Sequence, residues 1–280
     1  MDGIIIINKE KNYTSNDVVS IVKKITKSKV GHTGTLDPNA TGVLPLLIGN
    51  ATKISKYLIN HDKEYEVVLQ LGIRTETADV EGKVIEEKEV TAEMLNKDNI
   101  EEKLQQFIGK QEQIPPIYSA IKVNGKKLYE YARKNEKVEV KSRQIEIYKM
   151  ELIKLDLKEN IIKFKVRCSK GTYIRTLCED IAEKLNTYGY MKELQRTEVG
   201  DFKIENAITI GELEELVNEN KLKDKINEEA LNIVNSKDRK YFIKIEELFM
   251  DKKIINLDED LLNKFLNGVM IKNNNIDGIY

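Results

Sequence analysis

The sequence predicts an α+β fold with a largely antiparallel sheet. Two segments, 63–71 and 162–168, alternate apolar and polar residues as half-buried strands do. Two others, 18–25 and 174–185, place apolar residues at helical spacing. Strands and helices are mixed without the strand–helix–strand rhythm that builds a parallel sheet, and this favours antiparallel pairing.

The first elements lie within the first 30 residues. The apolar run from Ile4 to Ile7 predicts a buried strand. Thr14, followed by Asp17 three residues later, has the spacing of a capping box and predicts a helix start. The apolar stripe at 18–25 then continues the helix, and the lysines near its end suit the negative end of the helix dipole.

The later elements follow the same two patterns. In the strand 63–71, Tyr65 shares one face with three aliphatic residues. Residues 92–108 have a helical pattern. Gly171 ends the strand 162–168, and the stripe 174–185 predicts the helix that follows.

Composition leaves room for one sizeable core and a small appended domain, since the chain has 280 residues and is 40% hydrophobic. The net charge is only −1, but its distribution is uneven. Residues 20–36 carry +4, residues 122–149 carry +5, and residues 211–230 carry −4. Such asymmetry suits a protein with one face toward a polyanion, although any single charge run taken alone is more typical of a solvated surface.

The two cysteines, Cys168 and Cys178, are not arranged as a CxxC pair, and both fall at apolar positions of predicted elements. No secretory signal and no apolar stretch of 18 residues is present. We therefore expect a cytoplasmic protein with reduced, buried thiols and no membrane span. With two histidines and no clustered ligands, we expect no metal, and nothing suggests another cofactor.

Residues 31–45, GHTGTLDPNATGVLP, contain a single acidic residue, Asp37. Because Asp37 precedes a proline, its backbone is biased away from helix, and three nearby glycines permit turns. The ordinary interpretation is a turn residue bonded to its own backbone. The alternative is a catalytic carboxylate presented on a loop.

The longer string, GHTGTLDPNATGVLPLLIGNATK, resembles the catalytic segment of the bacterial tRNA pseudouridine-55 synthase (TruB) family. The resemblance covers roughly residues 1–215. Further segments resemble the family's other motifs in chain order: KEYEVVLQLGIRTETADVEG (63–82), IPPIYSAIKVNGKKLYEYARK with a basic helix after the prolines (114–134), VRCSKGTYIRTLCEDIAEKL (166–185) and LQRTEVGDF (194–202).

The resemblance implies the pseudouridine synthase fold: a central mixed sheet, flanking helices and a catalytic cleft across the sheet. It implies isomerisation of uridine 55 in the T-loop of tRNA, by base flipping and without a cofactor. Asp37 would be the essential catalytic residue, and attack at C6, attack at C1′ and a glycal route all remain open. Arg175 would pair with Asp37, and Tyr65 would stack on the target base. Without the resemblance, Tyr65 reads as a core aromatic and Arg175 as an exposed cation.

Substrate contacts are also implied. His32 would take the place of the flipped base, although a plain loop histidine is the alternative. Tyr173 would line the pocket beside Arg175. Five lysines would contact RNA phosphates: Lys27, Lys29, Lys122, Lys126 and Lys127.

The resemblance weakens toward the C-terminus. Tyr190 stands where the family commonly has His, and Gln195 where it commonly has Arg. Residues 255–272 resemble the start of a small RNA-binding PUA-like domain, but only eight residues follow. We therefore expect a catalytic domain at 1–240 and a partial PUA-like region at 241–280, either minimal or truncated.

Three other functions compete. The GxxG at Gly31–Gly34 beside lysines is typical of a KH clamp, so a non-catalytic RNA-binding or tRNA-folding module is the main alternative. The second alternative is the RNA-guided relative that modifies ribosomal RNA. That group usually carries a full PUA domain and works with protein partners, and this chain is short for it. The third alternative is a glycosidase-like hydrolase, which should show two paired carboxylates, whereas Asp37 is the only acidic residue of its motif. We favour a stand-alone synthase whose partner is the T-arm stem-loop of tRNA, acting as a monomer without an obligate protein partner.

Overall fold

The computed structural model describes residues 2–58, 61–219, 241–249 and 257–269. The chain divides into two compact units, residues 1–244 and 245–280. The first unit contains the large sheet and most of the helices. In the second unit the described elements are η3 (Glu246–Phe249) and α8 (Glu259–Leu266).

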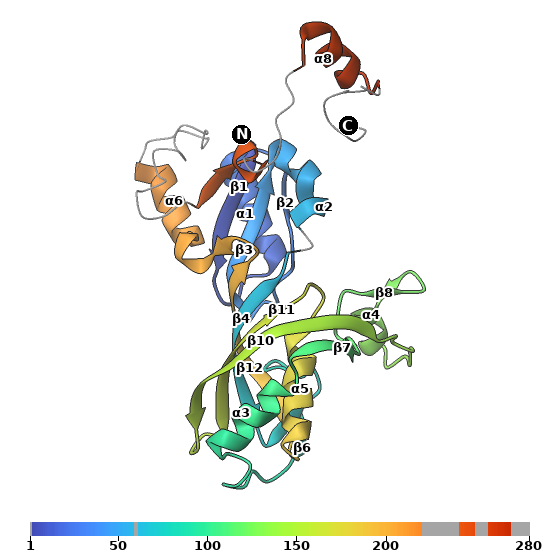
Figure 1. Ribbon diagram of the computed structural model, residues 1–280, viewed down its shortest axis with the longest axis vertical. Helices are drawn as coiled ribbons and strands as arrows, with labels where there is room; N and C mark the ends of the chain where they lie inside the picture. Colours follow the sequence, from blue (N-terminus) through green and yellow to red (C-terminus); the bar gives the residue numbers. More distant parts are fainter. Residues whose placement is uncertain (1, 59–60, 220–240, 250–256, 270–280) are drawn as a thin grey trace. The chain divides into compact units, whose positions relative to one another are not determined.

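The large sheet forms the centre of the first unit (Figure 1). Two short strands pair onto it, β2 (Val30–His32) with β3 and β13 (Phe202–Lys203) with β12. In spatial order its main strands are β14 (Phe242–Lys244), β1 (Gly3–Lys9), β3 (Thr41–Ile48), β12 (Gly189–Val199), β4 (Lys63–Leu71), β11 (Ile161–Cys168), β10 (Arg143–Asp156) and β7 (Gly109–Gln113).

Pairing in the described part of the sheet is antiparallel except between β3 and β12. These two run parallel where Gly42 faces Arg196. Gly42 has a φ of 104°, and a Cβ there would lie 2.1 Å from the Arg196 carbonyl oxygen. Glycine is therefore required for this approach. The predicted mixed, largely antiparallel sheet is confirmed.

Helices cover the sheet (Figure 1). The helix α1 (Ser15–Thr26) packs against β2 and α6 (Ile210–Glu219), α3 (Lys97–Gln105) packs against β10, and α5 (Ile174–Lys184) packs against β12. The remaining elements are η1 (Gly49–Ile54), α2 (Ser55–Leu58), α4 (Leu128–Ala132), η2 (Ile204–Asn206) and the two small sheets β5–β6 (Ile73–Thr75, Val84–Glu87) and β8–β9 (Lys122–Val123, Lys126–Lys127).

Most elements predicted from the sequence are present. The capping box of Thr14 and Asp17 starts α1 as predicted. The helix predicted over 92–108 is shorter, because the Asn96 side chain caps the helix by accepting from Asn99 N, so the helix begins at Lys97. Both cysteines are buried and free, in agreement with the prediction.

The basic helix expected after the prolines is the main correction. Residues 122–127 form the β8–β9 hairpin, and only 128–132 are helical. Asn124 and Gly125, with φ of 51° and 83°, make the two-residue turn. Asn-Gly favours this turn because both positions need positive φ. The hairpin therefore displaces most of the expected helix.

The predicted domain boundary after residue 240 stays a prediction. The first unit extends to Lys244, because β14 pairs with β1. Of the predicted PUA-like segment, residues 255–256 and 270–272 lie outside the described residues. In the residues described, no helix combines the length and apolarity needed to cross a membrane.

Candidate active site

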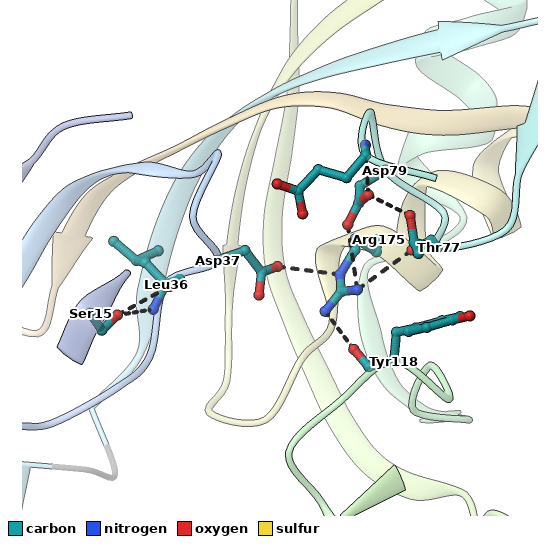
Figure 2. A network of polar contacts seen from close by, with 8 residues as sticks. Ser15, Leu36, Asp37, Thr77, Asp79, Tyr118 and Arg175 are labelled. Carbon is teal, nitrogen blue, oxygen red and sulfur yellow. Dashed lines mark hydrogen bonds and ion pairs between the residues drawn. The ribbon is translucent and has the colours of Figure 1, made fainter. Parts of the chain in front are cut away.

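Asp37 lies in residues 33–40, between β2 and β3, a stretch called here the Asp37 segment. Side chains from β1 and α1 hold it. The buried Lys9 donates from Nζ to the carbonyls of Pro38 (3.1 Å) and Tyr13 (2.7 Å). Ser15 Oγ donates to the Leu36 carbonyl (3.0 Å) and accepts from the Leu36 amide (2.9 Å). Figure 2 shows this pair beside Asp37.

A third side chain, Arg196 of β12, holds the same segment from another direction. It is 2% exposed. Its guanidinium donates to the carbonyls of Val43 (2.7 Å), Gly34 (3.1 Å) and Thr35 (3.5 Å). Burial lowers the pKa of this guanidinium. The Asp37 segment is thus held by two buried cations and one buried hydroxyl.

The predicted pairing of Arg175 with Asp37 is present. Arg175 Nε lies 3.3 Å from Asp37 Oδ2. The Arg175 side chain is 10% exposed, whereas that of Asp37 is 40% exposed. Arg175 also contacts Asp79 (3.5 Å) and donates to the Tyr118 carbonyl (3.1 Å), as Figure 2 shows. Asp79 is itself held by Thr77 Oγ1 at 2.5 Å. This network orients the arginine toward Asp37.

A cavity of about 710 Å³ opens beside this ion pair. Asp37, Arg175, Tyr65 and Tyr173 all line it, so the structure brings four predicted site residues together. Tyr65 is 9% exposed, and burial raises its pKa to about 12. A buried phenol beside an ion pair and open to a cavity can stack on a flat ring.

The other predicted residues are not among those lining the cavity. His32 lies on β2, next to the lining residue Thr33. Burial lowers the pKa of His32, and its Nδ1 is buried with no hydrogen-bond partner among the residues that the structure describes. Lys27 caps α1 at its C-terminus, and Lys29 follows in the connection to β2.

The three remaining lysines lie on the β8–β9 hairpin. Lys122 and Lys126 are exposed and Lys127 is half-buried. Lys126 lies 3.8 Å from Glu136, and Lys127 lies over the ring of Tyr129 at 5.4 Å. Tyr129 lines the cavity, so this hairpin is connected to the cavity wall.

Several residues of this site were not predicted. Lys9, Asp79 and Arg196 hold the segment or the ion pair. Lys9 had one signal, a cation at the end of a run of apolar, core-facing residues, whereas Arg196 had none because its strand carries several other charged residues. The cavity is also lined by residues without such a signal, namely Lys63, Tyr118, Tyr129, Arg143, Lys170 and Leu194. Among the described residues no three His, Cys, Asp or Glu side chains are grouped as metal ligands.

Two family models match the chain. The one described as TruB family pseudouridylate synthase (N terminal domain) matches residues 22–174. The one described as tRNA pseudouridylate synthase B C-terminal domain matches residues 175–236. The chain belongs to the TruB family of pseudouridylate synthases. The resemblance seen in the sequence is confirmed.

Relatives named tRNA pseudouridine synthase B agree with this family assignment. The tRNA pseudouridine synthase B of Alkaliphilus oremlandii is 52% identical over 219 residues, which are 78% of this chain and 72% of the relative. That of Caldanaerobacter subterraneus subsp. tengcongensis is 45% identical over 274 residues, 98% of this chain and 87% of the relative.

A solved structure agrees on the fold. A chain in the crystal structure of a Cbf5–Nop10–Gar1 complex superposes with a TM-score of 0.65 at 29% identity. The match covers 88% of this chain and 60% of that one, so this chain spans about three fifths of its length. The predicted pseudouridine synthase fold is thereby confirmed.

Proposed function

We propose that this protein is a tRNA pseudouridine synthase that isomerises uridine 55 in the T-loop of tRNA. The observation that carries the proposal is the Asp37–Arg175 ion pair at 3.3 Å, on the wall of a cavity also lined by Tyr65 and Tyr173. The names of the relatives support tRNA as the substrate.

The reaction breaks the bond between N1 and C1′, turns the uracil, and joins C1′ to C5. The proton on C5 leaves and N1 gains one, so no oxidant or added group is needed. Asp37 is the group proposed to attack or to act as base at the sugar–base junction. Arg175 is a cation in contact with it and orients the carboxylate.

Base flipping is required, because C1′ and C5 of a stacked base are out of reach. Tyr65 offers an aromatic face within the cavity, and Tyr173 is a second ring on its wall. We propose that His32 occupies the place vacated by the base. The phosphates of the T-arm would be bound by Lys27, Lys29 and the lysines of the β8–β9 hairpin.

A non-catalytic RNA-binding module would need the lysines but not the ion pair. Burying Arg175 costs free energy that its two carboxylate neighbours must offset, and RNA binding alone gives no reason for that arrangement. We therefore place the chain among the catalysts. We propose that it works as a monomer in the cytoplasm, without a cofactor.

The test compares wild type with Asp37→Asn on a T-arm stem-loop transcript and on full-length tRNA. We expect wild type to convert a single loop uridine, and the near-isosteric variant to bind RNA but form no pseudouridine, a loss of at least about 10³-fold. Binding without conversion by wild type would refute the proposal in favour of an RNA-binding module.

A further inference from the structure

Arg196 lies where three parts of the proposed site meet. On β12 it pairs in register with Tyr65 of β4 on one side and with Gly42 of β3 on the other. Its side chain lines the cavity and is 2% exposed. A single arginine therefore lies between the strand of the tyrosine and the strand that follows Asp37.

Arg196 contacts the Asp37 segment and pairs in register with Tyr65. The guanidinium donates to the carbonyls of Gly34 and Thr35, two to three residues before Asp37, and to Val43 of β3. Tyr65 is the register partner of Arg196 on β4, and the nearby guanidinium charge lowers the pKa of the phenol against the larger effect of burial. The planar, five-donor geometry of arginine suits several acceptors in different directions.

The charge of Arg196 has no carboxylate partner in the part of the chain that the structure describes, in contrast to Arg175 with its two. A buried unpaired cation is costly, and well-packed apolar residues often replace buried charges without loss of stability. Packing alone therefore does not account for a guanidinium at this position. Its donors bind three backbone carbonyls, those of Val43, Gly34 and Thr35.

We propose that Arg196 is a positioning residue for pseudouridine formation, holding the Asp37 segment in a fixed position beside the strand of Tyr65. Through the carbonyls of Gly34 and Thr35 it sets the approach of Asp37 to the sugar–base junction. Through its register pairing it also lies beside Tyr65, whose ring is proposed to stack on the base. This inference rests on the proposed function and adds a residue to its machinery.

The test uses full-length Arg196→Met and Arg196→Lys. The first removes every donor with similar volume. The second keeps a cation, but one ammonium group cannot reproduce the fork of a guanidinium. We expect single-turnover rates at saturating tRNA to fall at least about tenfold in both, more in Arg196→Met, while the dissociation constant for tRNA changes by less than about threefold.

A second readout reports on Tyr65 without catalysis. Fluorotyrosine introduced at position 65 is titrated by ¹⁹F NMR in the absence of RNA. Arg196→Met should raise the pKa of this phenol, since a neighbouring cation favours its ionised form, and Arg196→Lys should raise it less. An arginine whose charge does not reach the phenol would leave this titration unchanged. If wild type forms no pseudouridine, the proposed function fails, and this readout still tests the Arg196 contact.

Thr197→Val is the matched control. Thr197 is the next residue of β12, is 8% exposed, and donates from Oγ1 to Glu64 Oε1 at 2.9 Å. The Thr197→Val substitution should lower the stability of the protein without changing the single-turnover rate. The inference is overturned if Arg196→Met or, should that variant not fold, Arg196→Lys keeps the wild-type rate or leaves the phenol titration unchanged.

Discussion

Arg175 occupies a helix position that disfavours a cation, and the structure shows which groups compensate. It is the second residue of α5, where a cation opposes the positive end of the helix dipole at a cost of about 0.3–1 kcal/mol. An anionic neighbour would offset that cost, but without the family resemblance an exposed arginine was the favoured interpretation; the structure shows Asp37 as that neighbour. The second carboxylate, Asp79, comes from the loop after β5 and was not predicted. The two together make the buried guanidinium tolerable.

Lys9 gives a pH dependence of stability. Burial lowers the pKa of its ammonium to about 8, whereas an unfolded lysine titrates near 10.4. Between these values the unfolded chain binds more protons, so the free energy of unfolding rises with pH, by up to about 1.4 kcal/mol per pH unit. This contribution is complete above the unfolded pKa and is lost as pH falls through about 8.

The measurement is urea denaturation of wild type and Lys9→Met at about pH 7.5, 8.5 and 9.5. We expect the stability difference, wild type minus variant, to grow with pH. Lys11→Met, at an exposed neighbour, controls for the loss of a lysine and should show no such trend. A difference that stays constant for Lys9→Met would contradict the shifted pKa.

At the scale of elements, α1 anchors the Asp37 segment through Ser15. Its hydroxyl bonds both polar groups of Leu36, and all of these atoms are buried. Ser15→Ala leaves the Leu36 amide and carbonyl without that partner, which should cost about 1–3 kcal/mol. Because Leu36 adjoins Asp37, the single-turnover rate should also fall. Ser20→Ala, at an exposed position of the same helix, should change both by little.

Thermal unfolding and single-turnover assays check this prediction. A loss of stability without a loss of rate would show that Ser15 supports the fold but not the position of Asp37. Wild-type behaviour in both would mean that water replaces the lost hydroxyl.

The β8–β9 hairpin is the element we expect to meet the RNA backbone. Replacing Lys122, Lys126 and Lys127 by Ala should weaken tRNA binding and lower the slope of log K against log salt by up to about 2–3, since each phosphate contact contributes about 0.7–0.9. The rate at saturating tRNA should stay near wild type. A control triple at Lys97, Lys149 and Lys154, exposed lysines outside the cavity lining, should leave the slope unchanged. An unchanged slope in the hairpin triple would remove the hairpin from the RNA interface.

At the scale of the whole molecule, the site is complete within one chain. Asp37, Arg175, Tyr65 and Tyr173 all belong to the first unit, so no second copy is needed to assemble the cavity. We expect light scattering on the purified protein to give a mass near 32.3 kDa. A mass near twice that value at working concentrations would contradict the predicted monomer.

Local patterns in the sequence were sufficient for most of the elements. Apolar periodicity located β4, β11, α1 and α5 to within about three residues at either end, because alternation and helical spacing are set by which side of an element faces the core. The helix predicted after the prolines was wrong over 122–127, again because of a local pattern. The composition of this segment suits a helix, but Asn124–Gly125 permits a tight turn that competes with it.

Patterns in the sequence determined the fold class, and its resemblance to the TruB family indicated the catalytic candidate Asp37 and its arginine partner. Only the tertiary structure decided which cations hold the Asp37 segment and which residues line the cavity. Lys9, Asp79 and Arg196 come from β1, from the loop after β5 and from β12. Their meeting depends on strand order and register, and above all on the parallel contact of β3 with β12 at Gly42. The carbonyls that Arg196 binds lie 153 to 162 positions away in the chain, and no local pattern encodes such contacts, because they form only when the sheet is assembled.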